Sequence, residues 1–299
     1  MDNQSHIRFT AEIAEWFNQR WDQHMGAIDG KDISFLTSLL EAERPNVAVE
    51  IGCASGLSTS ILASFLDQIG NARLVSFDID DRFYMDRSKE VGYLLQEALP
   101  SPSIDISVKP GTTSLDVDAH VEGPIDFCFI DAAHKHPWPL IDTLAVLPLM
   151  KPGGVIVHHD LQMFRSQGFY ATGPKILLDQ VPRELAIRHW SVPTIQGFEK
   201  LKSRAIDGNI FAIRVPEEYR SLGLKLSQGF YIGWDGDSSK RVPDSFARKF
   251  GQMVSQHYDP GVEKAFKIGL GRYNPPADQQ ELPQSLFQKF VKRLSATRP

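Results

Sequence analysis

Residues 1–45 carry apolar side chains at helical spacing. The pattern predicts one amphipathic helix that reaches Trp21 and, after a break at Gly26 to Gly30, a second helix with Asp32 as its N-cap. We expect both helices to pack on the domain that follows. The apolar positions behind this prediction are Phe9, Ile13, Trp16, Phe17 and Trp21 in the first helix and Ile33, Leu36, Leu39 and Leu40 in the second.

From residue 46 onward, short β-type runs alternate with helical patterns. This alternation is typical of βαβ units, in which parallel strands form a sheet that helices cover on both faces. The last two strands have no clear helix between them and are predicted to pair as an antiparallel hairpin at the sheet edge. The predicted strands are 47–51, 74–77, 104–108, 125–130, 155–157, 185–190 and 209–215, and the predicted helices are 58–69, 83–98 and 137–150.

The pattern changes after Pro216, where Gly, Pro and charged residues become frequent. Helical pieces are predicted at 244–256 and 284–294 in this last part. Two roles fit it: it covers the site, or it forms a dimer contact. The three predicted parts are N-terminal helices at 1–45, an α/β domain at 46–216, and a C-terminal, mostly helical and irregular appendage at 217–299.

The composition excludes several classes of protein. The 299 residues carry 32 Lys and Arg against 37 Asp and Glu, a mildly acidic balance that argues against a nucleic-acid partner. Cys53 and Cys128 lie in apolar contexts and are interpreted as reduced packing residues. No basic segment precedes an apolar run at the start, and no apolar stretch approaches the length of a membrane span. We therefore expect a cytoplasmic protein without membrane contact. We also expect a small-molecule substrate, and the sequence is compatible with a homo-oligomer.

The first candidate site is the turn from Glu50 to Gly56, directly after a strand. Ligands of open α/β sheets bind beyond the carboxyl ends of the strands, and glycine lets the backbone approach them closely. Glu50 suits a cationic ligand, whereas a nicotinamide site favours three glycines that open a helix toward a pyrophosphate. Asp78 ends the next strand, where an acid can accept both hydroxyls of a ribose. The alternatives are an ordinary βα turn and a helix cap at Asp78.

Several motifs, in order, resemble those of the class I S-adenosylmethionine-dependent methyltransferases. The resemblance covers residues 30–215, and its later motifs are similar to the small-molecule and sugar O-methyltransferases related to catechol-type enzymes. It implies S-adenosylmethionine as the cofactor and a Rossmann-like α/β fold whose seven-stranded sheet has its last strand antiparallel. The motifs are Val49 to Gly56, Asp78, Ile125 to His134, and Leu149 to Asp160.

The resemblance also implies which residues bind the cofactor. One group would line its methionine half, an acid would hold the ribose, and the segment after the third strand would contact the adenine. Thr112 in that segment fits a helix N-cap equally well. The implied cofactor-binding residues are Glu50, Gly52, Ala54 and Gly56 for the methionine half, Asp78 for the ribose, Gly111 and Thr112 for the adenine, and Asp131 beside the cofactor ammonium.

Acids and histidines follow the fourth and fifth predicted strands. Asp131 ends one strand and His159 with Asp160 ends the other; adjacent strands lie about 5 Å apart, so these side chains can converge on one cation. In the catechol-type branch the matching positions bind Mg²⁺, but His159 stands where that branch has an acid. An imidazole would favour a transition metal or would not ligate. The alternative is that Asp131 bonds the cofactor while Asp160 caps the next segment.

His134 follows Asp131 on the same loop and is the candidate general base, because imidazole titrates near neutral pH. His136 and His158 are interpreted as structural, and Trp138 as a pocket wall or a core residue. The predicted function is methyl transfer to a small hydroxylated metabolite or sugar, with Asp131 and His134 catalytic. The alternatives are a non-catalytic or regulatory protein that keeps the cofactor pocket and a nicotinamide-dependent oxidoreductase.

Overall fold

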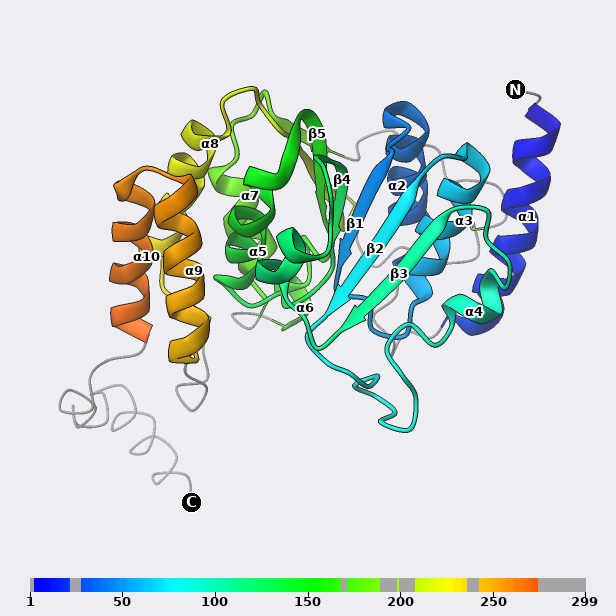
Figure 1. The fold of residues 1–299 in the computed structure, drawn as a ribbon, viewed down its shortest axis with the longest axis horizontal. Coiled ribbons are helices and arrows are strands. Elements are labelled where there is room, and N and C mark those ends of the chain that lie inside the picture. The colour runs from blue at the N-terminus through cyan, green and yellow to red at the C-terminus, as the bar shows by residue number, and fades with distance from the viewer. Residues whose placement is uncertain are drawn as a thin grey trace, which may run out of the picture.

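A seven-stranded sheet lies between two groups of helices in the computed structural model (Figure 1). The structure describes residues 12–21, 28–167, 171–188, 198, 208–235 and 242–273 in full, and the backbone alone of residues 3–11. The predicted helix at 284–294 and the end of the predicted strand at 185–190 lie outside the described residues.

The strand order across the sheet is β3-β2-β1-β4-β5-β7-β6. All neighbours pair in parallel except β7, which is antiparallel to both β5 and β6. This order confirms the predicted Rossmann-like sheet and the antiparallel pairing of its last two strands. The strands are β1 Val47–Ile51, β2 Arg73–Asp78, β3 Asp105–Pro110, β4 Ile125–Ile130, β5 Met150–His158, β6 Ala186–Arg188 and β7 Phe211–Arg214.

The helices cover both faces of the sheet. In Figure 1, α1 to α4 lie on one side of the strands, and α5 and α7 to α10 lie on the other. The helices are α1 Asn3–Arg20, α2 Gly30–Glu43, α3 Leu57–Ile69, α4 Leu95–Ala98, α5 Trp138–Val146, α6 Phe164–Gln167, α7 Gly173–Gln180, α8 Tyr219–Leu226, α9 Asp244–His257 and α10 Pro260–Tyr273, with short 3₁₀ segments η2 Ser114–Ala119, η3 Leu147–Leu149 and η5 Ser227–Tyr231.

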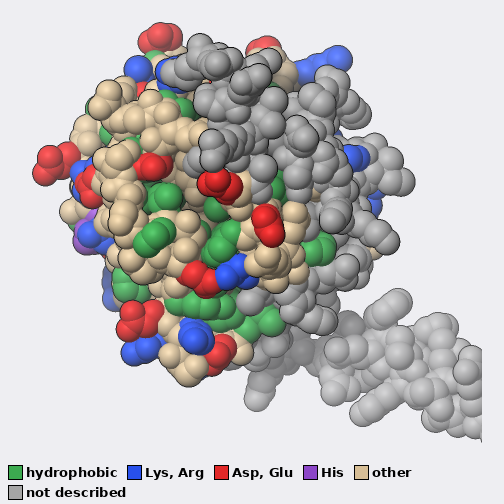
Figure 2. Space-filling model, turned by 90° about the vertical axis from the view of Figure 1, so that its right-hand side faces the viewer, with side chains coloured by type: hydrophobic (Ala, Val, Ile, Leu, Met, Phe, Trp, Pro, Cys, Tyr) green, Lys and Arg blue, Asp and Glu red, His purple; other side chains and the backbone are tan. Residues whose placement is uncertain are grey.

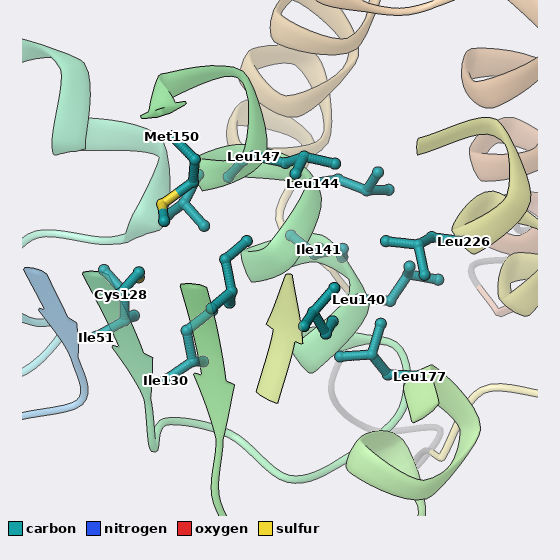
Figure 3. Close-up of a cluster of buried hydrophobic side chains, with 14 of the residues drawn as sticks. Ile51, Cys128, Ile130, Leu140, Ile141, Leu144, Leu147, Met150, Leu177 and Leu226 are labelled. Atoms are coloured by element: carbon teal, nitrogen blue, oxygen red, sulfur yellow. The ribbon is translucent and has the colours of Figure 1, made fainter. Parts of the chain in front are cut away.

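Successive side chains of each strand point to opposite faces of the sheet, so the apolar core is divided into two layers. Phe127 and Phe129 of β4 face the layer that α2 and α3 complete, whereas Cys128 and Ile130 face the layer that α5 completes. Figure 3 shows Leu140, Ile141 and Leu144 of α5 in this second layer. Both cysteines are buried and free, as predicted.

The N-cap of α2 differs from the prediction. Asp29, not Asp32, occupies the cap, and its carboxylate accepts from the backbone N–H groups of Lys31 and Asp32. Asp32 is the third helical residue, and its carboxylate accepts from the backbone N–H of Asp29 at 3.0 Å. This reciprocal arrangement is a capping box. It fixes the Asp32 side chain at the start of α2, which matters for the site described below.

The predicted helix at 83–98 is wrong for most of its length, because only α4 at its end is helical. The carboxylate of Asp86 accepts from both the backbone N–H and the hydroxyl of Ser88, a local turn that competes with helical hydrogen bonds. Gly92 then adopts a φ of +75°, which ends any helical path before α4. The segment instead forms a loop beside the carboxyl end of β2.

The C-terminal helices pack onto the second core layer. The predicted helix at 244–256 is confirmed as α9, and α8 and α10 were not predicted. Phe250 of α9, Phe266 of α10 and Phe230 of η5 are buried together, with the Phe250 and Phe266 ring centroids 4.6 Å apart. These three rings belong to the same buried cluster as Leu140 and Leu144 of α5, which joins α9 and α10 to the α/β domain.

The surface is mixed in charge on the face that lies to the right in Figure 1. Figure 2 shows acidic and basic side chains of the described residues interspersed with hydrophobic ones on that face. None of the helices in the described ranges combines the length and the apolar character that a membrane span requires.

Candidate active site

A cavity of about 310 Å³ opens at the carboxyl ends of β1, β2 and β4. Its walls include five of the predicted cofactor residues: Gly52, Ala54, Asp78, Thr112 and Asp131. It lies where strand order changes direction on either side of β1, the usual ligand position in open α/β sheets. The remaining lining residues are Ile51, Phe77, Ile79, Tyr84, Thr113, Ser114, Ala132, Ala133, Trp138, Asp142 and Phe246.

Two positions in the turn after β1 require glycine, because backbone atoms of other segments lie very close to them. Gly52 has a φ of +98°, and a Cβ there would lie 2.3 Å from the carbonyl oxygen of Asp131. Gly56 has a φ of +87°, and its Cβ would lie 2.8 Å from the Cα of Gly92. Both positions therefore exclude a side chain. Gly52 lines the cavity, while Gly56 does not, because it starts α3 behind the turn.

Asp78 ties the end of β2 to this turn. One carboxylate oxygen accepts from the backbone N–H groups of Cys53 at 3.0 Å and Ala54 at 2.8 Å, and the other accepts from Asp80 at 2.9 Å. The carbonyl of Asp78 accepts from the backbone N–H of Thr112 at 2.8 Å. Asp78 thus sits in the cavity wall between the glycine turn and the segment after β3.

Glu50 does not line the cavity, contrary to the prediction. Its side chain is fully buried on the α3 side of β1, where it accepts from the hydroxyls of Ser58 at 2.7 Å, Thr59 at 2.5 Å and Ser76 at 2.7 Å. Burial raises the pKa of Glu50 to about 7, although the three hydroxyls oppose this shift. Glu50 therefore anchors the first turn of α3. Gly111 also lies outside the cavity wall, next to Thr112, which lies in it.

His159 lies between carboxylates, and its predicted role as a metal ligand stays a prediction. Its Nδ1 is 3.2 Å from Asp131 Oδ1, and its Nε2 is 3.0 Å from Asp32 Oδ2. Burial lowers the pKa of His159, but Asp160, Asp131 and Asp32 together raise it well above its usual value. Both ring nitrogens of this buried histidine therefore lie within hydrogen-bond distance of a carboxylate oxygen. The sequence analysis did not identify Asp32 as a partner of His159, because no motif near Asp32 indicates such a contact.

A different trio meets at the ends of β4 and β5. Asp131, His134 and Asp160 each offer one ligand atom, and these three atoms lie within 4.8 Å of one another. His134 Nε2 is 3.1 Å from Asp160 Oδ2, and Asn209 donates to the other oxygen of Asp160 at 2.7 Å. Burial raises the pKa of Asp131, but His159 and His134 hold it below its usual value. Asp131 belongs both to this trio and to the cavity wall.

His136 and His158, the two other histidines considered in the sequence analysis, are structural, as predicted. His158 is buried, and its Nε2 lies 2.9 Å from the hydroxyl of Thr143, while burial lowers its pKa to about 3. His136 is also buried, with its Nε2 3.0 Å from the carbonyl of Gly229, and burial lowers its pKa to about 4. Both rings are neutral at physiological pH and lie outside the cavity wall.

Several cavity residues were not predicted. Asp142 and Ser114 line it from α5 and η2, Tyr84 from the loop after β2, and Phe246 from α9. The one sequence signal among these is Asp142, a lone acid in the apolar run of α5. Trp138 joins them and meets Phe246 with ring centroids 5.2 Å apart, so it both lines the cavity and packs against α9.

The sequence of this region matches a known family. Residues 49–161 match the family model described as a methyltransferase domain. These residues are therefore similar to a methyltransferase domain. The match spans β1 to the end of β5. It therefore includes Asp78, the trio of Asp131, His134 and Asp160, and most of the cavity wall. It confirms the predicted enzyme class.

Solved structures with a likeness to this methyltransferase include enzymes with different acceptors. They are an O-methyltransferase from Bacillus cereus in complex with SAH (18% identity, 69% of this chain and 90% of that chain covered, TM-score 0.46), the O-methyltransferase TomG from Streptomyces achromogenes in complex with SAM (18%, 72% and 91%, 0.43), and the N-methyltransferase NodS from Bradyrhizobium japonicum (18%, 62% and 94%, 0.38). These values are too low to transfer an acceptor or a site residue to this chain. A comparison with curated protein sequences finds no significant match.

Proposed function

We propose that this methyltransferase transfers a methyl group from S-adenosylmethionine to a hydroxyl group of a small molecule. The observation that carries this proposal is that Asp131 belongs both to the cavity wall and to the trio with His134 and Asp160. In such a transfer the bond from the methyl carbon to sulfur breaks as the bond to oxygen forms, and the hydroxyl proton must leave. A neutral amine needs no such deprotonation before attack, so a cluster of this kind favours an oxygen nucleophile.

Cofactor binding is proposed for the residues of the cavity wall. Asp78 would accept the ribose hydroxyls, Gly52 and Ala54 would lie along the methionine part, and Thr112 would lie beside the adenine. Asp131 would face the ammonium group or the acceptor. Glu50 would act from behind the wall, because its three hydroxyl partners include two residues of the first turn of α3.

His134 is the proposed general base. Its Nε2 lies 3.1 Å from Asp160 Oδ2, and a ring proton held there by the carboxylate would leave Nδ1 as the nitrogen that can take a proton. Asn209 in turn donates to Asp160, so the carboxylate has a fixed orientation. The proton of the acceptor hydroxyl would pass to Nδ1 of His134, and S-adenosylhomocysteine would leave as the second product.

The same trio fits a divalent cation. Its donor set is two carboxylate oxygens and one imidazole nitrogen, close enough together to share one ion. A bound cation would lower the pKa of the acceptor hydroxyl by direct coordination. The imidazole favours a transition metal over Mg²⁺. Asp131, His134 and Asp160 would hold the ion, and His134 would then be a ligand instead of a base.

Methyl transfer to a panel of catechols, other phenols and sugars tests the proposal, with S-adenosylhomocysteine measured as product. His134→Gln should lower kcat by a factor on the order of 10² to 10⁴, the usual contribution of a general base. His257→Gln, at the remote end of α9, is the matched control and should be fully active.

Treatment with EDTA separates the two roles of the trio. Activity that disappears with EDTA and returns with a divalent metal supports the ligand role, and unchanged activity supports the base. A fully active His134→Gln variant, with or without EDTA, would rule out both.

A further inference from the structure

A chain of buried side chains connects the start of α2 to the wall of the cavity. Asp32 Oδ2 lies 3.0 Å from His159 Nε2, and His159 Nδ1 lies 3.2 Å from Asp131 Oδ1. Asp32 is 1% exposed and His159 is 3% exposed, whereas Asp131 lines the cavity. The structure describes all of α2, and none of its residues lines the cavity. Asp32 therefore reaches the cavity wall through His159.

Capping of α2 does not by itself account for Asp32. Its Oδ2 accepts from the backbone N–H of Asp29 at 3.0 Å, so one oxygen serves both the cap and His159. The other oxygen, Oδ1, is buried and has no hydrogen-bond partner among the described residues. A cap needs one accepting oxygen and no charge, whereas a buried carboxylate with an unpaired oxygen costs free energy. The second contact, with the His159 ring, accounts for a carboxylate at this position.

The His159 ring is held on both sides. Its backbone N–H donates to the carbonyl of Ile130 at 3.2 Å, and Asp32 contacts Nε2 of the ring. On the opposite side, Nδ1 lies 3.2 Å from Asp131 Oδ1 and 3.6 Å from Asp160 Oδ1. An imidazole is rigid and planar, so a carboxylate that holds one ring nitrogen also fixes the direction of the other. Asp32 therefore sets the direction in which His159 faces the two acids.

We propose that Asp32 is a positioning residue for the methyl transfer. It holds the ring of His159, and this ring holds Asp131 at the cavity wall, where the transferred methyl group is proposed to lie. The inference rests on the proposed function and applies equally to a base cluster and to a cation site. Removal of a carboxylate that supports a functional histidine typically costs about 10- to 100-fold in affinity or activity, and we expect this range here.

Calorimetric titration with two nucleosides tests this inference without an acceptor. Sinefungin carries an ammonium group at the position of the transferred methyl, and S-adenosylhomocysteine carries no group there. The wild type should bind sinefungin more tightly, because Asp131 accepts from the ammonium. Asp32→Ala should lower the ratio of the two affinities about tenfold or more, because Asp131 loses its support. Effects on the parts that the two ligands share cancel in this ratio.

Asp29→Ala is the matched control, because it weakens the same capping box but leaves Asp32 and the backbone N–H that contacts it in place. It should lower stability and keep the wild-type ratio. In a His159→Gln background, Asp32→Ala should have no further effect on the ratio. If Asp32→Ala does not fold, Asp32→Asn keeps an oxygen for the cap but removes the charge, and it should lower the ratio severalfold.

Turnover of an acceptor from the panel gives a second readout. Asp32→Ala should lower kcat at least about tenfold and leave the KM for S-adenosylmethionine nearly unchanged, because Asp32 contacts neither substrate. A raised KM with a normal kcat overturns the inference. So does an unchanged affinity ratio in the Asp32 variant that folds, an equal decrease in Asp29→Ala, or a further decrease in the His159→Gln background. A wild type that binds neither nucleoside, or both equally, instead contradicts the proposed function.

Discussion

At the residue scale, Asp78 has the most direct predicted effect on cofactor affinity. Asp78→Asn removes the negative charge that would accept the ribose hydroxyls and weakens its bonds to Cys53 and Ala54. We expect the affinity for S-adenosylhomocysteine to fall by about 10- to 100-fold, the usual loss for a hydrogen bond to a charged group. Calorimetry measures this change. Asp81→Asn, an exposed acid of the same loop, is the control; equal affinities in both variants would show that Asp78 does not contact the nucleoside.

Glu50 should make stability depend on pH. Its pKa is about 7 in the folded protein against 4.5 for an exposed glutamate, so the folded state binds a proton that the unfolded state has lost. Stability contributed by this group is complete below pH 4.5, falls as pH rises, and is lost above pH 7. The total change is roughly 3 kcal/mol.

Glu50→Gln removes this titration. As the pH rises from 5 to 8, the free energy of unfolding of the variant should therefore increase relative to that of the wild type. Denaturant unfolding at both pH values measures this change. Glu41→Gln, on an exposed position of α2, should track the wild type at both pH values. A constant difference between Glu50→Gln and the wild type would mean that Glu50 is not buried as a protonated acid.

Strand-end acids could be predicted from the sequence, but the partners of His159 could not. Asp78 and Asp131 follow apolar strands directly, so the sheet itself fixes their positions. His159 next to Asp160 looked like a ligand because the side chain that engages it, Asp32, lies far away in the sequence on α2. A pattern of neighbouring residues carries no information about such a contact.

At the element scale, α9 has two functions along its length. Phe250 is fully buried against Phe266 and Phe230, whereas Phe246, one turn earlier, is half-buried and lines the cavity. Phe250→Ala should lower the free energy of unfolding by about 3–5 kcal/mol through cavity formation. Denaturant unfolding measures this loss.

Phe246→Ala should act mainly on the ligand. It removes one wall of the cavity, so we expect a severalfold lower affinity for S-adenosylhomocysteine and a smaller loss of stability than for Phe250→Ala. Calorimetry and unfolding on both variants give the comparison. The account of α9 is contradicted if Phe246→Ala binds the nucleoside normally, or if both variants lose the same stability.

Helices and strands with regularly spaced apolar residues could be predicted from the sequence. Segments whose conformation depends on local side-chain hydrogen bonds could not. β1, β2 and β4 match because buried parallel strands are mostly continuous apolar runs, whereas β3 is a half-buried edge strand and only the apolar end of β5 was predicted. The segment 83–98 carries apolar residues at helical spacing, but the Asp86–Ser88 turn and Gly92 override that spacing. The predicted three-part division of the chain stays a prediction, although α9 already contributes Phe246 to the cavity of the α/β domain.

At the scale of the whole molecule, the sheet and the helices on both of its faces contribute to the site. The sheet supplies Asp78 and Asp131 to the cavity wall, and α9 on one face supplies Phe246. On the other face, α2 supplies Asp32, which contacts His159, the neighbour of Asp131. Asp131 belongs both to the cavity wall, where the cofactor is proposed to bind, and to the trio with His134 and Asp160. The account therefore requires the reacting sulfur of the cofactor to lie next to Asp131, and the nucleoside to extend from there past Asp78.

A crystal structure of the protein with S-adenosylhomocysteine bound tests this requirement most directly. The account predicts the ribose hydroxyls on Asp78, the adenine beside Thr112 and the sulfur facing Asp131, with His134 across an open acceptor space. A nucleoside bound elsewhere on the sheet, or with its sulfur turned away from Asp131, would contradict it.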